Sequence, residues 1–188
     1  MRPKIKKMTF DKLADNFEVV SVQEQALYIG GARIYLNADG SSPTFVSDGS
    51  QTGTETLILN GNEIELPLGT WNRQGNSGTS ATNTAAAKKM FAFLGQYSTA
   101  EWMMAIRECG TVGIFTCHNP NHVGMRWDGG DTIKWVHSHP LSRCSELSGP
   151  DFDMADAHRH KYHALFYNGQ FRSFDSAGFY GDWRDTVW

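Results

Sequence analysis

The second half of the chain carries the clearest alternation of hydrophobic and polar positions. Residues 83–95 (NTAAAKKMFAFLG) begin with a capping-type Asn, continue through an Ala-rich body and end on Gly95, a residue type that commonly follows a helix. Their apolar residues Ala86, Ala87, Met90, Phe91 and Leu94 share one face. The pattern predicts an amphipathic helix over 83–95 that packs on a sheet.

Strands are expected directly after this helix. Apolar, β-prone runs separated by short polar turns predict four strands, over 101–106, 110–117, 122–127 and 131–139. Pro150 suits the first turn of a further helix that is capped by Ser148 or Gly149 and runs to about His160. Residues 163–176 predict an aromatic hairpin around Asn168-Gly169, and the aromatic tail that follows should fold back on the core.

The first 82 residues show weaker patterning and are interpreted as an accessory segment, separate from a main domain over 83–188. Phe10, Leu13 and Phe17 have helical spacing within 8–24, and a hairpin is predicted over 56–66 around Asn60-Gly61. The remaining stretches are an extended segment over 26–36, a polar loop or linker over 37–54, and a Gly-rich polar stretch over 69–82.

Composition narrows the functional class. The chain has 188 residues, of which 40% are hydrophobic, a formal net charge of -3 and a pI near 6.1, which argues against nucleic-acid binding driven by phosphate neutralisation. It contains no apolar run long enough to span a membrane, and its basic start lacks the apolar core of a signal peptide. Three cysteines are an odd number and cannot form a complete disulfide framework. We therefore expect a soluble protein without nucleic-acid or membrane partners.

The most chemically specific stretch is VHSHPLSRCSELSGPDF, residues 136–152. His137 and His139 are two residues apart, so they project from the same face of an extended segment. Asp151 adds an oxygen donor at a helix start. Two His and one carboxylate with a fourth position open is the ligand count of a catalytic zinc site.

The pattern His-Ser-His-Pro, seven residues, then Ser-x-x-Asp resembles the signature of the JAMM (MPN-type, JAB-domain) zinc metalloproteases. The resemblance covers roughly residues 83–176. It implies a cytidine-deaminase-like α/β fold, with a mixed sheet flanked by helices, and hydrolysis of peptide or isopeptide bonds. It also implies one Zn²⁺ per chain, held by His137, His139 and Asp151, with Ser148 donating to the oxyanion.

In that family a Glu before the first core strand acts as the general base. Glu101 occupies this place, and Glu108, at the far end of the same strand, is the competitor. The pair Glu101-Trp102 after an Ala- and Phe-rich helix also resembles the JAB-like toxin domains of bacterial polymorphic toxins. That likeness implies a secreted effector delivered as part of a larger protein, a protein or peptide substrate (ubiquitin-like or bacterial), and a dedicated immunity protein.

Other interpretations remain open. A catalytically inactive MPN-like module that binds proteins as a scaffold is the main alternative, although such modules typically lose the ligand set that is present here. Cys117, His118 and His122 offer a weaker second metal site. His158, His160 and His163 surround a predicted helix end, where histidines interact favourably with the helix dipole.

Overall fold

The computed structural model describes residues 31–47, 53–73, 78–81, 83–124 and 131–185. Within these ranges the chain forms two β-sheets and two α-helices. The helix predicted over 8–24 and the end of the aromatic tail lie outside the described residues. The α/β class expected from the sequence is confirmed.

The smaller sheet has the strand order β2-β1-β3-β4. The β3–β4 hairpin is confirmed, since Asn60 and Gly61 have φ angles of 51° and 77°, as a type I′ turn requires. One prediction is wrong here, because β2 forms within the stretch expected to be a polar loop. Its Thr-Phe-Val run is β-prone and pairs antiparallel with β1. The strands are β1 (Ala32–Leu36), β2 (Thr44–Ser47), β3 (Thr54–Leu59) and β4 (Asn62–Pro67).

The larger sheet has the order β12-β11-β10-β9-β7-β8-β6-β5. It is mixed, because β9 and β10 run parallel and the other neighbours antiparallel. The strands are β5 (Asn72–Arg73), β6 (Gly78–Ala81), β7 (Trp102–Arg107), β8 (Val112–Thr116), β9 (Thr132–Ser138), β10 (Tyr162–Tyr167), β11 (Gln170–Asp175) and β12 (Gly178–Arg184).

Two differences from the predicted elements concern this sheet. β5 and β6 come from the stretch expected to be irregular, so the larger sheet begins before residue 83. Residues 122–124 form no strand beyond an isolated bridge between Asn119 and His122, and 125–127 lie outside the described residues. The predicted hairpin around Asn168-Gly169 is confirmed, and the tail pairs with it as β12.

The helices are α3 (Thr84–Tyr97) and α4 (Gly149–Ala157). The Asn83 side chain caps α3 by accepting the N–H groups of Ala85 and Ala86. Gly95 was predicted to follow the helix, but it lies inside α3. A Cβ there would come within 2.9 Å of Ser138 and 2.8 Å of Phe166, so Gly95 serves close packing on the sheet. α4 ends at Ala157, earlier than predicted.

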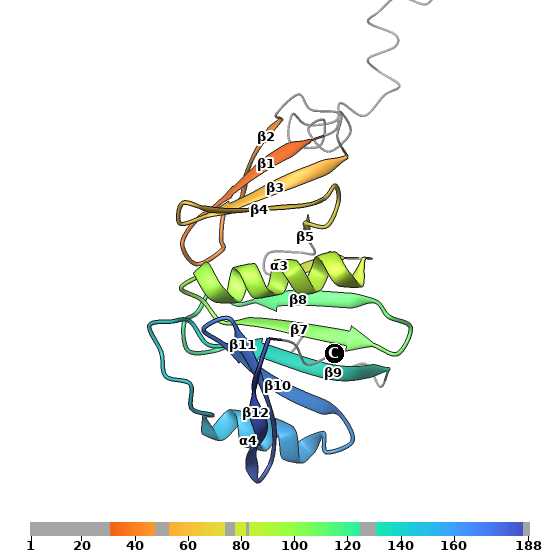
Figure 1. Cartoon of the computed structure of the whole chain (residues 1–188), viewed down its shortest axis with the longest axis vertical. Coiled ribbons are helices and arrows are strands. Elements are labelled where there is room, and N and C mark those ends of the chain that lie inside the picture. Colours follow the sequence, from red (N-terminus) through yellow and green to blue (C-terminus); the bar gives the residue numbers. More distant parts are fainter. Residues whose placement is uncertain (1–30, 48–52, 74–77, 82, 125–130, 186–188) are drawn as a thin grey trace, which may run out of the picture.

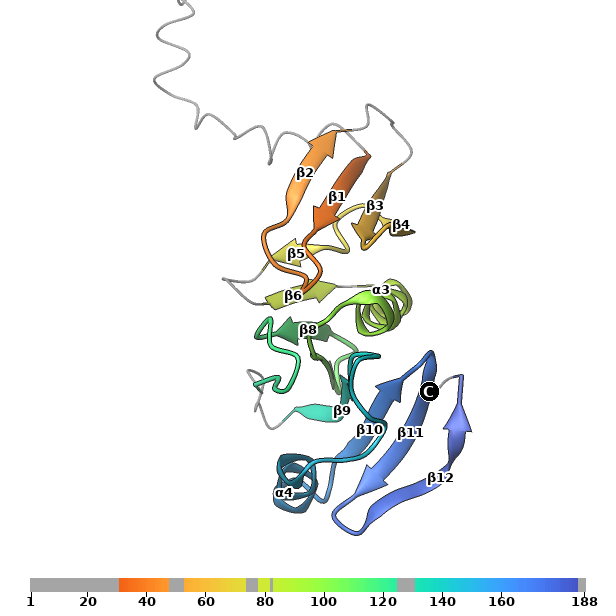
Figure 2. The ribbon, with the colours of Figure 1, turned by 90° about the vertical axis from the view of Figure 1, so that its left-hand side faces the viewer.

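α3 lies between the two sheets and α4 covers the opposite face of the larger one (Figures 1 and 2). The main core joins Met90, Phe91 and Leu94 of α3 to Ile34 and Leu57 of the smaller sheet and to inward residues of the larger sheet. A second cluster with Met103 and Trp135 packs beneath Met154 of α4. Side chains therefore alternate along β7 and β9 between the α3 face and the α4 face.

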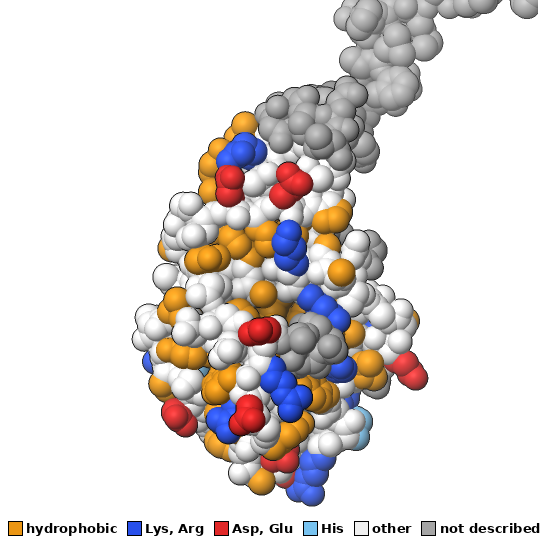
Figure 3. Space-filling model, viewed as in Figure 1, with side chains coloured by type: hydrophobic (Ala, Val, Ile, Leu, Met, Phe, Trp, Pro, Cys, Tyr) orange, Lys and Arg blue, Asp and Glu red, His pale blue; other side chains and the backbone are white. Residues whose placement is uncertain are grey.

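The surface mixes charge signs, with acidic and basic side chains interspersed on the face seen in Figure 3. Neither helix in the described ranges combines the length and the apolar character that crossing a membrane requires.

Candidate metal centre

The three predicted ligands meet between β9 and α4. His137 lies near the end of β9 on the α4 face, His139 follows two residues later, and Asp151 lies in the first turn of α4. Their ligand atoms all lie within 4.8 Å of one another. His137 Nε2 is 3.2 Å from Asp151 Oδ1, and His139 Nε2 is 4.0 Å from Asp151 Oδ2. Two ligands of a tetrahedral zinc ion are separated by about 3.4 Å. The His137–Asp151 pair is at that spacing, and the His139–Asp151 pair is wider.

Both imidazoles present Nε2 to the centre. His139 is held through Nδ1, which lies 3.0 Å from the Cys144 carbonyl; an Nδ1–H donor leaves the Nε2 lone pair facing inward. His137 is 2% exposed, and its Nε2 is close to Asp151 but lacks the alignment of a hydrogen bond with any described residue. A buried, unsatisfied nitrogen beside a second imidazole and a carboxylate is what a metal ion would satisfy.

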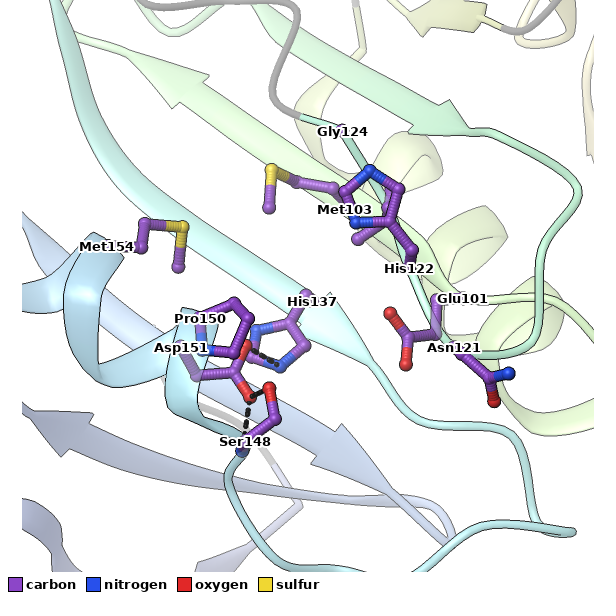
Figure 4. A pocket seen from close by; sticks show the side chains of 11 residues that line it. Glu101, Met103, Asn121, His122, Gly124, His137, Ser148, Pro150, Asp151 and Met154 are labelled. Carbon is purple, nitrogen blue, oxygen red and sulfur yellow. Dashed lines mark hydrogen bonds and ion pairs between the residues drawn. The ribbon is translucent and has the colours of Figure 1, made fainter.

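Asp151 is oriented by Ser148, the residue that caps α4. The Ser148 backbone N–H and hydroxyl both donate to Asp151 Oδ2, at 2.7 and 2.6 Å (Figure 4). Oδ1 is left on the side of His137. The hydrogen bonds that cap α4 therefore also orient the Asp151 carboxylate toward the two histidines.

The pKa values of the ligands favour the forms that bind metals. Burial lowers the pKa of His137 to about 4, against the attraction of Asp151, so the imidazole is neutral near pH 7. Burial raises the pKa of Asp151, but His137 and the two bonds from Ser148 outweigh it, so its pKa lies below the usual value. A neutral imidazole and an ionised carboxylate are the ligating species.

Glu101 stands across the group, immediately before β7. Its Oε1 is 3.8 Å from His139 Nε2, and the residue is 7% exposed. Burial and the neighbouring Asp151 raise the pKa of Glu101 to about 7, while Arg143 opposes the shift. Glu108 lies after the other end of β7, is exposed, and is not part of the group. A carboxyl that titrates near neutral pH beside a metal group suits general acid–base work.

A cavity of about 200 Å³ opens beside these residues. Glu101, His137 and Asp151 are among its polar lining residues, and Met103 and Met154 are apolar ones (Figure 4). Val123 adds a further apolar side chain to the lining. The apolar lining residues, Asn121 and Gly124 were not predicted from the sequence, because they come from segments far from His137 and Asp151 in the chain. His122, which was predicted as part of a weaker second metal site, lines this cavity instead.

Apart from His122, which lines the cavity, the residues of the other two histidine groups contact other parts of the chain. His118 Nδ1 lies 3.0 Å from the Asp39 carbonyl, and Cys117 Sγ accepts the Gly124 N–H. His158 packs edge-on against Trp135, and His163 Nε2 lies 3.2 Å from the His158 carbonyl. Within the part of the chain that the structure describes, the triad of His137, His139 and Asp151 is the only group with the spacing of a metal site.

Comparison of the chain with protein-family models, with curated proteins and with solved structures finds no match.

Proposed function

We propose that this protein is a zinc-dependent hydrolase of the JAMM type that cleaves peptide or isopeptide bonds. The observation that carries the proposal is the convergence of His137, His139 and Asp151, with Glu101 facing the same centre from the start of β7. These residues occupy the positions of the family's motif, and the mixed sheet with α3 and α4 on opposite faces agrees with the cytidine-deaminase-like fold that the motif implies.

The donor set favours zinc. Two imidazole nitrogens and one carboxylate oxygen leave a coordination position open, which distinguishes catalytic from structural zinc sites. Zinc in such a site supplies Lewis acidity, which activates water at neutral pH. The soft thiolates that a closed structural site would require are absent from this group.

Glu101 is the general base of the proposed reaction. Its carboxylate accepts a proton from the attacking water and then gives it to the leaving amine, which needs a group that exchanges protons near pH 7. The raised pKa of about 7 meets that need in the metal-free site. The cavity beside it gives the scissile bond access to Glu101, with an apolar wall for a neighbouring part of the substrate.

In the resting site, the role of Ser148 is to orient Asp151. A serine has one hydroxyl proton, and here it is directed at Asp151 Oδ2. The predicted role as an oxyanion donor requires the hydroxyl to turn toward the cavity, whose lining includes Ser148.

The likeness of the Glu101-Trp102 segment to JAB-like toxin domains supports a more specific proposal: the chain is the effector part of a secreted bacterial toxin, and an immunity protein covers the cavity. Its substrate would be a ubiquitin-like conjugate or a bacterial protein. The scaffold alternative is less well supported. Burial of the Glu101 carboxyl beside Asp151 lowers the stability of the fold, and a module that only binds proteins has no need of such a buried acid.

The function is tested with ubiquitin-like isopeptide conjugates and bacterial lysate proteins as substrates, with cleavage followed by mass spectrometry. We expect Glu101→Gln to abolish cleavage and to keep the zinc, since the amide cannot accept the proton. Glu108→Gln is the matched control, because it makes the same change at the exposed acid beyond β7. If Glu101→Gln cleaves as well as the wild type and Glu108→Gln does not cleave, Glu108 would be the general base. An inactive wild type with a full zinc site would favour the scaffold.

A further inference from the structure

The Trp102 side chain, next to Glu101, is enclosed by residues that precede α3 in the chain. Trp102 is 1% exposed. A Cβ on Gly40 would come within 2.3 Å of its Cζ2 atom, so the indole lies directly against the Gly40 backbone. Trp71 contacts it edge-on, with ring centroids 6.5 Å apart. Trp71 is held in turn by Glu55 of β3, whose carboxylate accepts its backbone N–H.

The turn between β1 and β2, residues 37–41, also hydrogen-bonds to the segment just before Glu101 and to the 118–119 loop. The Thr99 N–H donates to the Ala38 carbonyl at 2.8 Å, two residues before Glu101. His118 Nδ1 lies 3.0 Å from the Asp39 carbonyl. The neighbour of His118, Asn119, accepts the Glu101 N–H at 2.9 Å. The 37–41 turn thus supports Glu101 both directly along the chain and through the 118–119 loop.

Internal hydrogen bonds define the conformation of this turn. The Gly40 N–H donates to the Asn37 carbonyl at 2.8 Å, the Ser41 N–H to Asp39 Oδ1 at 2.9 Å, and Asn37 Nδ2 to Ser41 Oγ at 3.1 Å. Gly40 has a φ of 77°, which glycine adopts without strain. These bonds therefore hold the turn in the conformation in which the Ala38 and Asp39 carbonyls meet Thr99 and His118 and the Gly40 backbone packs against Trp102.

We propose that the 37–41 turn is a positioning element for Glu101, so that the smaller sheet is part of the catalytic unit. The inference rests on the proposed function, in which Glu101 is the base. Glu101 precedes β7 and is not one of its residues, so its backbone is fixed by Asn119, by Thr116, and by the packing of Trp102. A base displaced by about 1 Å can lose about 100-fold in rate.

The test compares Gly40→Ala with Gly61→Ala. Both glycines have a φ of 77°, so alanine meets the same backbone strain at each, but Gly61 has open space and Gly40 has Trp102. We expect Gly40→Ala to lower kcat about 10- to 100-fold, with KM and zinc content unchanged. Gly61→Ala should keep the wild-type kcat. Equal kcat in the two variants, each folded and zinc-loaded, would overturn the inference.

Amide hydrogen exchange separates this inference from the proposed function, because it does not depend on activity. Gly40→Ala should increase exchange at the Thr99 and Trp102 amides, and Gly61→Ala should not. Unchanged exchange at both amides would overturn the positioning role. Wild-type protein without any hydrolysis, but with the expected exchange changes, would support the contact and refute the hydrolase.

A second variant covers the case that Gly40→Ala does not fold. His118→Gly removes the side chain bonded to Asp39 and tolerates the φ of 55° at this position. We expect a several-fold fall in kcat with KM and zinc content retained. A wild-type kcat in this variant would contradict the claim that the 37–41 turn positions Glu101 through the 118–119 loop.

Discussion

The Trp102 backbone N–H donates to Ser138 Oγ at 3.0 Å, in a fully buried position. Trp102 follows Glu101, and Ser138 stands between His137 and His139. Beside the backbone pairing of β7 with β9, this hydrogen bond therefore joins the residue after the proposed base to the residue between the two proposed histidine ligands. Ser138 faces α3 and contributes no metal ligand, as the alternation along β9 predicts, but its hydroxyl adds to the β7–β9 pairing that holds the two parts of the site together.

Ser138→Ala should weaken both stability and catalysis. The variant leaves the Trp102 N–H buried without an acceptor, which typically costs about 1–3 kcal/mol. We expect a lower free energy of unfolding in urea and a reduced kcat, with zinc still bound, because neither imidazole is altered. Ser176→Ala, at an exposed serine, is the control and should match the wild type. Wild-type stability in Ser138→Ala would show that the hydrogen bond contributes nothing.

Gly95→Ala tests the packing of α3 against Ser138 and Phe166 of the larger sheet. Alanine is favoured over glycine in a helix by about 1 kcal/mol, so propensity alone predicts a gain. The new Cβ would come within 2.8 Å of Phe166 and 2.9 Å of Ser138, and such overpacking typically costs about 1–3 kcal/mol. We expect a net loss of stability by thermal unfolding. Gly149→Ala in α4 meets no atom within 4 Å and should be neutral or stabilising.

Ser148→Ala should lower zinc affinity. Loss of the hydroxyl frees Asp151 Oδ2 from one of its two bonds, and removal of such an outer partner of a ligand typically costs about 10- to 100-fold in metal affinity. Competition with a chelator of known affinity measures the change. Ser148→Thr keeps a hydroxyl and should retain most of the affinity. An unchanged affinity in Ser148→Ala would mean that the backbone N–H alone orients the carboxylate.

The raised pKa of Glu101 predicts a pH-dependent difference in stability between the metal-free wild type and Glu101→Gln. The pKa of this carboxyl is about 7 in the folded protein, against 4.5 for an ordinary glutamate, so the wild type loses stability as pH rises between these values. Allowing for solvent screening, Glu101→Gln should gain about 2 kcal/mol over the wild type between pH 4.5 and pH 8.

The wild type must be compared with Glu101→Gln because His137 changes the stability of the metal-free protein with pH in the opposite direction. Its pKa falls to about 4, so its contribution to stability grows as pH rises from there to 6.5. Both proteins contain His137, and their difference isolates Glu101. Urea unfolding in the presence of a chelator gives that difference. A constant difference across the pH range would contradict the burial of an ionisable Glu101.

Local patterns in the sequence were enough to predict the elements with strong short-range signals. The two Asn-Gly hairpins, the capped Ala-rich helix and the Ser148-Pro150 helix start are each determined by residues that are close in the chain. The approach of His137 and Asp151 could be expected from the motif. β5 and β6 were not predicted, because such short polar segments become strands through pairing with partners elsewhere in the chain. β2 was missed for another reason, since its short β-prone run lies in a stretch whose overall composition is polar.

Contacts between distant segments were likewise beyond the sequence patterns. Gly95 carries a helix-end signal, but Phe166 and Ser138 determine its use inside α3. The polar composition of 37–54 predicted a linker, yet its first residues form the turn that packs on Trp102. Composition identifies such a stretch as polar and says nothing of the surface that it contacts.

The most direct test of the metal centre is the zinc content of the purified protein, measured for the wild type beside His137→Ala/His139→Ala. The matched control is His158→Ala/His160→Ala, which removes two histidines with the same spacing outside the centre. We predict about one zinc ion per chain in the wild type and the control, and none in the His137/His139 variant. A wild type that takes up no zinc even on reconstitution, or equal zinc in all three proteins, would contradict the proposed centre.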